Sequence, residues 1–492
     1  MTHNPNPIYA TSLGLLTDLY QLTMAYGYWQ SGRADQQAVF HWFFRNNPFE
    51  GGFVVTAGLS LVLDYIRDFQ FQSDDIEYLK TLVGEDGKAL FDDAFLDYLA
   101  NLKLSVDVDA MPEGTVAFPH QPLLRIRGPI LQCQLLETAL LNLLNFQTLL
   151  ATKSARICRA AGDDSVLEFG LRRAQGIDGG LSASRAAYIG GCAATSNVLA
   201  GKIYGIPVKG THAHSWIMSF DNELEAFRTY ADAMPNNCVF LVDTFDTLEG
   251  VRKAVEIGKY LREKGHSLLG IRLDSGDLAW LSIEARKILD DGGFADAKIV
   301  ASNDLDEHLI ESLKHQGAEI KVWGVGTRLA TAFDQPALGG VYKLAALEVD
   351  GQWVPKVKLS EQLIKTSTPG ILQVRRFSQR GEAKADMVYN ELQGPSSLIV
   401  DPLDNTRRRK MEADLDFEDL LVPQIKNGKP IHESETLATI RARVQCELSK
   451  FHSGILRLNH PHRYPVGLEA NLHDLKSTLV LRARGLDQGA SV

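Results

Sequence analysis

Short apolar segments recur along residues 166–344, and each is followed by a polar cluster and then by a helical pattern. This alternation is typical of βα units, whose strands lie parallel in one buried sheet. Strands are expected at residues 166–169, 206–208, 239–242, 268–271, 299–301, 320–323 and 341–344. So many consecutive units without a visible reversal of strand order predict an irregular, TIM-like α/β barrel. A doubly wound open sheet is the alternative architecture.

The residues on either side of this region have a mixed pattern. The expected elements before it are a helix from residue 17, a hairpin of strands 38–45 and 51–55, strands 114–118 and 123–127, and a continuous helix over 132–161. The predicted organisation is an N-terminal α+β domain of residues 1–145, the barrel of residues 146–349, and a C-terminal extension of residues 350–492 that packs on both.

Composition narrows the class of protein. The 492 residues are 45% hydrophobic and 23% charged, as in an ordinary globular chain. A net charge of −10 argues against sequence-independent nucleic-acid binding, which depends on neutralising phosphates. The five cysteines are scattered and never form a C-x-x-C pair, which predicts reduced thiols and a cytoplasmic protein. Neither a signal peptide nor a membrane span is expected.

Polar side chains gather where the predicted strands end. They include Arg172 and Arg173, Thr211 and His214, Asp243 and Asp246, Arg272, Asp274 and Asp277, Ser302, Asn303 and Asp304, and the turn Gly324 to Thr327. Arginine forks and free backbone N–H groups bind phosphate oxygens, and aspartates suit Mg²⁺ or ribose hydroxyls. Together they predict a phosphorylated sugar substrate. For each single aspartate, the alternative is a helix cap.

Two motifs in this region leave alternatives open. If the backbone stays extended, His212 and His214 point to the same side and could bind a metal. Otherwise one of them caps the next helix and the other is a packed core residue. The Gly324-x-Gly326 turn lacks the third glycine of a dinucleotide site, because Leu329 stands there, and the chain contains no P-loop sequence.

Several longer segments carry a family resemblance. They are Leu16 to Gln21, Glu168 to Gly176, Gly210 to Ser215, Val242 to Thr247, Arg272 to Asp277, Gly324 to Thr327 and Leu338 to Leu344. In this order they resemble the signature segments of nicotinate phosphoribosyltransferases, a type II phosphoribosyltransferase family.

The resemblance implies a reaction, a fold and an assembly. Nicotinate and phosphoribosyl pyrophosphate would give nicotinate mononucleotide and pyrophosphate, with Mg²⁺ present and with ATP hydrolysis coupled, as in a ligase. The reaction would be the first step of NAD salvage from nicotinic acid. The implied fold is an irregular barrel with an N-terminal domain, in a homodimer whose active sites lie at the interface.

The resemblance also assigns roles to residues. His214 matches a histidine that ATP phosphorylates transiently, which suits an imidazole nucleophile. Phe169 and the partner subunit's Tyr20 match the aromatic pair around the pyridine ring. The remaining matches are Arg172, Arg272 and Asp274 at the ring and pyrophosphate, Thr211 at the nicotinate carboxylate, Asp243 near the ribose or its metal, Ser302, Asn303, Gly324, Gly326 and Thr327 in a phosphate cradle, and Arg45, Lys343 and Ser367 as further phosphate contacts. Asp243 or Asp274 lies near Mg²⁺ in this interpretation.

Three other functions are alternatives to this one. In the related nicotinamide enzyme an acid accepts from the amide, and Ser196 occupies that place here, which favours nicotinate. A sugar-phosphate aldolase or isomerase would need a strand-end lysine, for which Lys209 and Lys321 are the candidates. A non-catalytic nucleotide-binding regulator is a third possibility. The basic run 407–410 is interpreted as a solvated face, with phosphate binding as the alternative.

Overall fold

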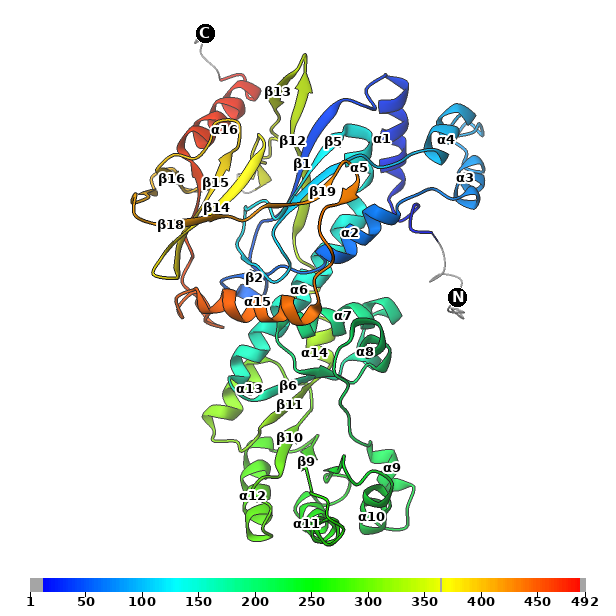
Figure 1. Cartoon of the computed structure of the whole chain (residues 1–492), viewed down its shortest axis with the longest axis vertical. Coiled ribbons are helices and arrows are strands. Elements are labelled where there is room, and N and C mark those ends of the chain that lie inside the picture. The colour runs from blue at the N-terminus through cyan, green and yellow to red at the C-terminus, as the bar shows by residue number, and fades with distance from the viewer. Residues whose placement is uncertain (1–11, 363–364, 487–492) are drawn as a thin grey trace. The chain divides into compact units, whose positions relative to one another are not determined.

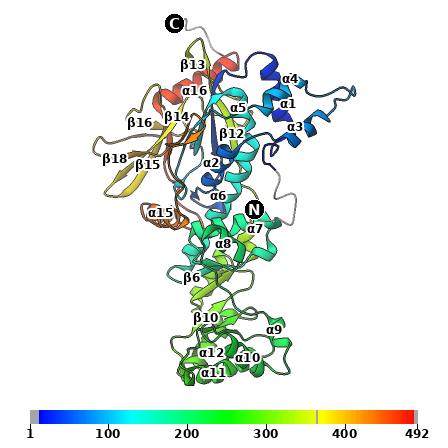
Figure 2. The ribbon, with the colours of Figure 1, turned by 45° about the vertical axis from the view of Figure 1, so that its right-hand side comes forward.

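The computed structural model describes residues 12–362 and 365–486. The chain forms two compact units, drawn in Figures 1 and 2. Unit 1 comprises Met1–Phe146, Leu338–Glu435 and Cys446–Val492, and unit 2 comprises Gln147–Ala337 and Thr436–Gln445. Most of the region 350–492 thus shares a unit with the N-terminal residues. No helix in the described ranges is long and apolar enough to cross a membrane.

Unit 2 contains a parallel sheet of six strands in the order β7-β6-β11-β10-β9-β8. Its strands are β6 (Ser165–Glu168), β7 (Ala194–Thr195), β8 (Val239–Leu241), β9 (Gly270–Leu273), β10 (Lys298–Ala301) and β11 (Val322–Val325). A helix follows each strand: α7 (Gly176–Gly190), α8 (Val198–Tyr204), α11 (Thr247–Glu263), α12 (Leu278–Asp291), α13 (Glu307–His315) and α14 (Thr327–Ala330). Two more helices, α9 (His214–Met218) and α10 (Glu223–Ala233), precede β8.

The helices bury one apolar face against the sheet. In α11 the buried residues Val251, Ala254, Val255, Gly258 and Leu261 recur at helical spacing. Val251, Ala254, Val255 and Leu261 belong to one apolar core with Phe240, Ile271, Ile299 and Trp323 from the strands. Both α11 and α12 pack on β9, and α12 also packs on β10 (Figure 1). The mixed α/β class predicted from the sequence is confirmed for this unit.

Closure of the sheet into a barrel is not confirmed. The strand order is a cyclic permutation of the chain order, which both a barrel and an open sheet allow. No ladder joins the edge strands β7 and β8 within the described residues. The predicted strand 206–208 is only an isolated parallel bridge between Thr195 and Val208, so that segment adds no full strand.

One strand predicted for the barrel belongs to a different sheet. Residues 341–344 lie in β12 (Gly340–Val349), which pairs antiparallel with β1 (Gln37–Phe44) in unit 1. An apolar run indicates a strand, but its sheet is chosen by long-range packing, which local sequence does not encode.

Unit 1 is built on two large sheets. The seven-stranded sheet has the order β13-β12-β1-β5-β3-β19-β20, with neighbouring strands antiparallel. Its other strands are β3 (Asp107–Ala110), β5 (Leu124–Pro129), β13 (Gln352–Pro355), β19 (Val422–Lys426) and β20 (Lys429–Pro430). The six-stranded sheet contains β14 (Leu372–Gln379), β15 (Glu382–Asn390), β16 (Leu398–Val400), β17 (Arg408–Lys410), β18 (Asp416–Asp419) and β21 (Val466–Glu469).

Two sequence predictions about unit 1 need correction. Residues 51–55 do not form a hairpin with β1, because β2 (Val54–Val55) pairs with β4 (Val116–Ala117). The helix expected over 132–161 is divided into α5 (Ile130–Leu135) and α6 (Glu137–Ala161). Unit 1 also contains α1 (Leu19–Gln30), η2 (Pro48–Glu50), α2 (Leu59–Asp68), α3 (Ser73–Lys80), α4 (Asp93–Ala100) and α16 (Ala470–Ala483), whereas α15 (Leu437–Ser449) runs across the boundary between the units.

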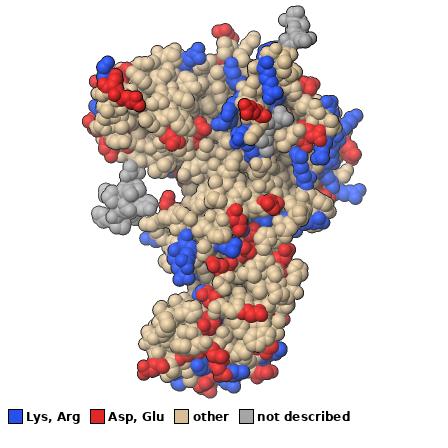
Figure 3. Space-filling view, turned by 180° about the vertical axis from the view of Figure 1, so that it is seen from behind, with Lys and Arg blue, Asp and Glu red and all other residues tan. Residues whose placement is uncertain are grey.

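The surface carries both signs of charge. Basic and acidic side chains are both exposed on the face drawn in Figure 3. The basic run predicted as a solvated face forms β17, whose three residues are all exposed at the edge of its sheet. Exposed charge on an edge strand opposes pairing with another chain, which agrees with that interpretation.

Candidate active site

Arg272, the third residue of β9, connects the ends of several strands of unit 2. Its Nε donates to Ser302 Oγ at 2.9 Å, and its Nη1 donates to Thr211 Oγ1 at 3.1 Å. Its Nη2 lies 2.9 Å from Asp274 Oδ1, and Ser302 Oγ donates to the same oxygen. The guanidinium also lies 5.7 Å from the centre of the Phe169 ring. One cation thus brings together four residues that the sequence had placed on separate strand ends.

Asp243 organises the neighbouring part of the site. Its side chain is only 1% exposed, and its Oδ1 lies 3.2 Å from Nε2 of His214. Its Oδ2 accepts from the Asp274 N–H at 2.9 Å and from Ser275 Oγ at 2.6 Å. The His214 side chain is 39% exposed, so solvent reaches this imidazole while the carboxylate behind it stays buried.

Two of the other strand-end aspartates are helix caps. Asp246 accepts from the Glu249 N–H at 2.9 Å and begins α11. Asp277 accepts from the Trp280 N–H at 3.1 Å and begins α12. The structure therefore separates caps from site residues, which the sequence left as alternatives for each aspartate.

The Phe169 ring is held where the backbone leaves β6. Its N–H donates to the Val325 carbonyl at 2.7 Å, which ties it to β11. A Cβ added to Gly324 would lie 2.8 Å from carbons of this ring. Only glycine leaves space for the aromatic side chain at this position. This explains Gly324 as a packing requirement and not only as part of a phosphate turn.

The buried carboxylate of Glu168 fixes the turn that follows β6. The sequence alone indicated no role for this residue. It is 1% exposed, and its carboxylate accepts from Ser184 Oγ at 2.9 Å, from Thr195 Oγ1 at 2.6 Å and from the Gly170 N–H. Its backbone carbonyl accepts from the N–H of Ser196 at 2.9 Å. The available signal was an acid at an inward position of a buried strand, but its partners are too far away in the chain to be predicted.

The predicted phosphate cradle consists of two loops with unusual backbone. Asn303 and Asp304 have φ of 107° and 41°, values uncommon for residues other than glycine. Both are exposed, whereas Ser302 is 5% exposed and bonded to Arg272. Gly326 precedes the single turn of α14, which begins at Thr327. Strained backbone persists where its surroundings hold it, and it is frequent at functional sites.

An ion network ties these two loops together. Arg328 of α14 lies 3.2 Å from Asp306, the cap of α13, and 3.5 Å from Asp334. Lys153 of α6 is fully buried and contacts Asp334 at 2.5 Å and Glu307 at 2.7 Å. Burial of both ends of the Lys153–Glu307 pair makes loss of one partner costly, which restricts movement of the loops.

The structure gives the two neighbouring histidines different surroundings. The His212 ring packs against Tyr230 at 4.9 Å, and its Nε2 accepts from the Leu241 N–H at 3.3 Å. Burial, with a smaller contribution from Arg272, lowers its pKa to about 4. His212 is therefore a neutral core residue, as in the alternative that the sequence left open, and His214 alone faces the site.

The described residues contain no group of three or more His, Cys, Asp and Glu side chains arranged to hold a metal ion. Asp243 uses both oxygens within the protein. Asp274 is 29% exposed, and its Oδ1 is bonded to Arg272. A magnesium ion here would fit Asp274 only with oxygens of a substrate as further ligands, which is the usual way that Mg²⁺ binds phosphorylated substrates.

The other predicted site residues are not part of this cluster. Arg172 belongs to the short helix η3 (Leu171–Arg173) and is exposed. The rest lie in unit 1. There Tyr20 is 49% exposed, with its pKa raised by burial and by Glu137, and Lys343 lies 3.7 Å from Glu137.

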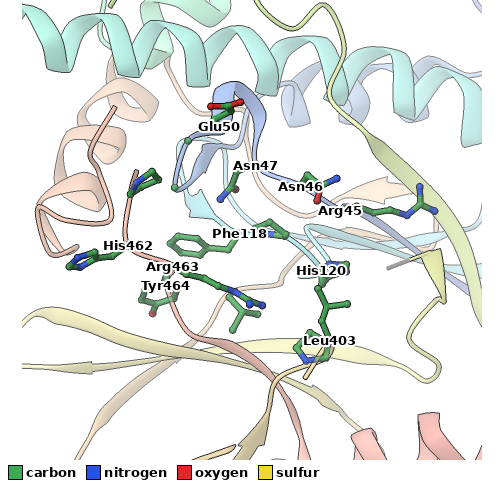
Figure 4. Close-up of a pocket in the computed structure, with 16 residues that line it drawn as sticks. Arg45, Asn46, Asn47, Glu50, Phe118, His120, Leu403, His462, Arg463 and Tyr464 are labelled. Atoms are coloured by element: carbon green, nitrogen blue, oxygen red, sulfur yellow. The ribbon is translucent and has the colours of Figure 1, made fainter. Parts of the chain in front are cut away.

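Ser367 and Arg45 are also in unit 1. Ser367 is 3% exposed and accepts from the Lys358 N–H at 2.9 Å. Arg45 follows β1 at the edge of a separate cavity of about 340 Å³ (Figure 4), and its side chain is directed away from that cavity.

A cavity of about 470 Å³ in unit 2 adjoins the cluster. Phe169, Gly210 and Thr211 line it together with strand residues such as Leu167, Val300 and Val322. Lys209 also lines it but is exposed, and Lys321 has a side chain that is 59% exposed. A Schiff-base lysine needs burial or a neighbouring cation to lose its proton, so these two do not support the aldolase alternative.

Three sequence models match: the nicotinate phosphoribosyltransferase N-terminal domain over residues 15–145, the nicotinate phosphoribosyltransferase family over residues 165–386, and its C-terminal domain over residues 373–476.

Curated relatives and a solved structure match over almost the full chain. The nicotinate phosphoribosyltransferase of Bacillus subtilis (strain 168) is 42% identical, covering 95% of this chain and 97% of the relative. That of Homo sapiens is 36% identical, covering 96% and 97%. The crystal structure of human nicotinic acid phosphoribosyltransferase matches with a TM-score of 0.82 at 34% identity, covering 94% of this chain and 100% of that chain. The chain therefore belongs to the nicotinate phosphoribosyltransferase family.

Proposed function

We propose that the protein joins nicotinate to phosphoribosyl pyrophosphate, giving nicotinate mononucleotide and pyrophosphate as the first step of NAD salvage from nicotinic acid. The observation that carries this proposal is the convergence of Arg272, Thr211, Ser302 and Asp274 beside the Phe169 ring. An aromatic carboxylate can stack on such a ring while its oxygens accept charge-assisted hydrogen bonds. Family membership supports the reaction class.

Nicotinate is proposed to stack on Phe169, with Tyr20 of the partner subunit on its other face. Its carboxylate would accept from Arg272 and Thr211, whose side chains are already bonded to each other. Ser196 follows β7. The resemblance implies an acid at this position in the nicotinamide enzyme, so we propose that Ser196 offers nicotinate a hydroxyl where that enzyme has a carboxylate. A carboxylate at this position would repel the anionic substrate, which is why nicotinate is favoured over nicotinamide.

In the transfer, the bond between ribose C1 and the pyrophosphate oxygen breaks, and its electron pair leaves with pyrophosphate. The ring nitrogen of nicotinate forms the new bond to C1. Negative charge grows on the departing group, so fixed cations and donors near it lower the barrier. We assign this role to Arg172 and Arg272 together with the cradle residues Ser302, Asn303, Gly324, Gly326 and Thr327.

Asp274 is the residue proposed to hold a magnesium ion, with diphosphate oxygens as the other ligands. The bound ion would supply positive charge to the leaving group. Within the chain, Arg272 and Ser302 hold Oδ1 of Asp274, whose side chain is 29% exposed, and these contacts orient the carboxylate for the task. The Asp243 carboxylate accepts from the backbone N–H of Asp274 and thereby orients Asp274.

His214 is proposed to accept the γ-phosphoryl group of ATP. If its Nε2–H donates to Asp243, the Nδ1 lone pair is the nucleophile and the tautomer is set by the carboxylate. The P–O bond to ADP breaks as the P–N bond forms, and Asp243 stabilises the positive charge of the imidazole. Hydrolysis of this phosphohistidine would couple ATP to product formation.

The remaining parts of the interpretation are also proposals. Tyr20 of the partner subunit would complete the site in a homodimer, and Arg45, Lys343 and Ser367 would be further phosphate contacts. The irregular barrel is also a proposal, with which the cyclic order of the parallel strands is compatible. The cytoplasmic location stays a prediction from the cysteine pattern.

The test is a comparison of acceptors in the full-length protein, with Ser196→Asp beside the wild type. The wild type is expected to make mononucleotide from nicotinate and little from nicotinamide. The variant is expected to lose nicotinate activity through charge repulsion and to gain use of nicotinamide. Ser312→Asp is the control, because it adds the same charge at an exposed position of α13 outside the site. Preference for nicotinamide in the wild type would overturn the assigned substrate.

A further inference from the structure

A buried polar network adjoins two residues of the pocket proposed for nicotinate, and the proposed reaction assigns it no part. Its members are Glu168, Ser184, Thr195 and Asn197, and each of them is at most 2% exposed. They belong to β6, α7, β7 and the N-cap of α8. Helix α7 packs on both strands and on α8 (Figure 1). Four segments thus meet at one carboxylate that is shielded from solvent.

Two chains of hydrogen bonds lead from Asn197 to the Glu168 carboxylate. In one, the Asn197 N–H donates to Thr195 Oγ1 at 3.0 Å, and the Thr195 hydroxyl donates to Oε2 of Glu168 at 2.6 Å. In the other, Asn197 Nδ2 donates to Ser184 Oγ at 3.2 Å, and the Ser184 hydroxyl donates to the same oxygen at 2.9 Å. Asn197 Oδ1 accepts from the Ala200 N–H at 3.2 Å, which fixes the orientation of the amide. Both chains therefore end in donors that need an acceptor at residue 168.

The same glutamate connects the two residues that are proposed to contact nicotinate. Its other oxygen, Oε1, accepts from the Gly170 N–H, so the carboxylate closes the turn around Phe169. Its backbone carbonyl accepts from the Ser196 N–H at 2.9 Å, which holds the residue after β7 at the end of β6. Glu168 and Thr195 are also partners in the β6–β7 ladder. The positions of the Phe169 ring and of Ser196 are therefore both set from Glu168.

The chemistry of the network favours one fixed arrangement. A carboxylate loses its hydration when it is buried, and hydrogen bonds to its oxygens must offset that loss. At Glu168 two hydroxyls and a backbone N–H supply them. Buried networks that are fully satisfied are rigid. Rigidity matters in a substrate pocket, because a displacement of about 1 Å can lower a rate about 100-fold.

We propose that Glu168 is a positioning residue that sets the spacing between the Phe169 ring and Ser196, and that it thereby determines how tightly nicotinate binds. The inference rests on the proposed function, because it takes nicotinate as the ring held by these two groups. In this proposal Glu168 does not contact a substrate. It acts through the turn after β6 and the residue after β7, which its carboxylate and its carbonyl hold.

Two substitutions interrupt the network with little change in volume. Glu168→Gln replaces an acceptor oxygen by an NH₂ donor, which must then face either the Gly170 N–H or the two hydroxyls. Thr195→Val keeps the shape of the side chain and removes its hydroxyl, whereas the matched variant Thr195→Ser retains the hydroxyl. Asp164→Asn is the control for loss of an acid, because Asp164 lies at the opposite end of β6 and accepts from Trp323 Nε1 at 3.3 Å.

The experiment measures three quantities in the full-length wild type and in each variant. They are kcat, the KM values for nicotinate and phosphoribosyl pyrophosphate, and the Kd of nicotinate by calorimetry. Melting temperatures show which variants are folded. A double-mutant cycle of Glu168→Gln with Phe169→Leu tests whether Glu168 acts through the ring.

We expect the KM and Kd for nicotinate to rise about 10-fold in Glu168→Gln and Thr195→Val, as when a buried hydrogen-bonding group is left unpaired. The value of kcat and the KM for phosphoribosyl pyrophosphate should change less than about 3-fold, because only binding of the ring is weakened. Thr195→Ser and Asp164→Asn should behave as the wild type. The effect of Glu168→Gln should be smaller when Phe169 is already leucine.

An unchanged nicotinate Kd in folded Glu168→Gln or Thr195→Val would overturn the positioning role. An equal rise in the KM for phosphoribosyl pyrophosphate, or additive effects in the cycle, would overturn it as well. If Glu168→Gln does not fold, the comparison of Thr195→Val with Thr195→Ser decides. A wild type that binds nicotinate but forms no mononucleotide would overturn the proposed function, and the Kd values would still decide the positioning role. Absence of nicotinate binding to the wild type would overturn both.

Discussion

Replacing Arg272 by lysine keeps the positive charge of the site and removes only the guanidinium fork. The fork makes three side-chain hydrogen bonds, to Ser302, Thr211 and Asp274, from a side chain that is 16% exposed. A lysine ammonium on its flexible stem can retain one of these contacts. Arg272→Lys therefore tests geometry and not charge.

The expected magnitude follows from the two lost contacts. A hydrogen bond to a charged group contributes about 1.5–3 kcal/mol, and water replaces part of each loss. We expect the transition state to lose about 3 kcal/mol, which lowers kcat/KM for nicotinate about 100-fold. The melting temperature should change little, because these groups lie at the rim of the sheet and solvent can satisfy them.

The assay is steady-state formation of nicotinate mononucleotide at saturating phosphoribosyl pyrophosphate. The matched control is Arg262→Lys, since that guanidinium also lies over a ring, Phe294 at 4.4 Å, and donates to the Gly293 carbonyl at 2.7 Å, but belongs to α11. The control should retain wild-type kinetics. A value of kcat/KM in Arg272→Lys within a few-fold of wild type would refute the reasoning.

Three other changes test separate parts of the account. Gly324→Ala places a Cβ 2.8 Å from the Phe169 ring, and since overpacking costs about 1–3 kcal/mol, we expect the KM for nicotinate to rise about 10-fold; an unchanged KM would contradict the stacking role. His214→Ala should abolish ATP coupling while some transfer continues, which the ratio of ADP to mononucleotide measures; a wild-type ratio is the contrary result. The folded pKa of His212, about 4, is below its ordinary value of 6.5, so protonation favours unfolding and stability is lost as pH falls from about 6.5 to about 4. In denaturant titrations, His212→Phe should reduce the loss of unfolding free energy between about pH 6.5 and about pH 4 by about 3 kcal/mol. A free energy of unfolding that depends on pH as in the wild type would contradict the burial argument.

The sequence predicted five of the six parallel strands of unit 2, because their apolar runs contain the residues that pack in the core, but it missed β7 and predicted a strand at 206–208 where only a bridge forms. Residues 166–169 and 299–301, for example, nearly coincide with β6 and β10. The sequence did not predict which strands pair with one another. Residues 341–344 form a strand as expected, but in the antiparallel sheet beside β1, since pairing depends on contacts between distant segments.

The roles of the site residues were also predictable only in part, because they depend on contacts between distant segments. Asp243 and Asp246 are equivalent by composition, yet one is buried against His214 and the other caps α11. The difference is geometric: Asp246 stands three residues before the N–H that it accepts from. The role of Glu168 could not be predicted, because Ser184 and Thr195 reach it only after the chain has folded.

The most direct test of the central claim is the formation of mononucleotide by purified full-length protein with phosphoribosyl pyrophosphate and Mg²⁺, with nicotinate or nicotinamide, and with or without ATP. Our account predicts nicotinate mononucleotide and pyrophosphate in equal amounts, stimulated by ATP, and little product from nicotinamide. No product from nicotinate under any of these conditions would contradict it.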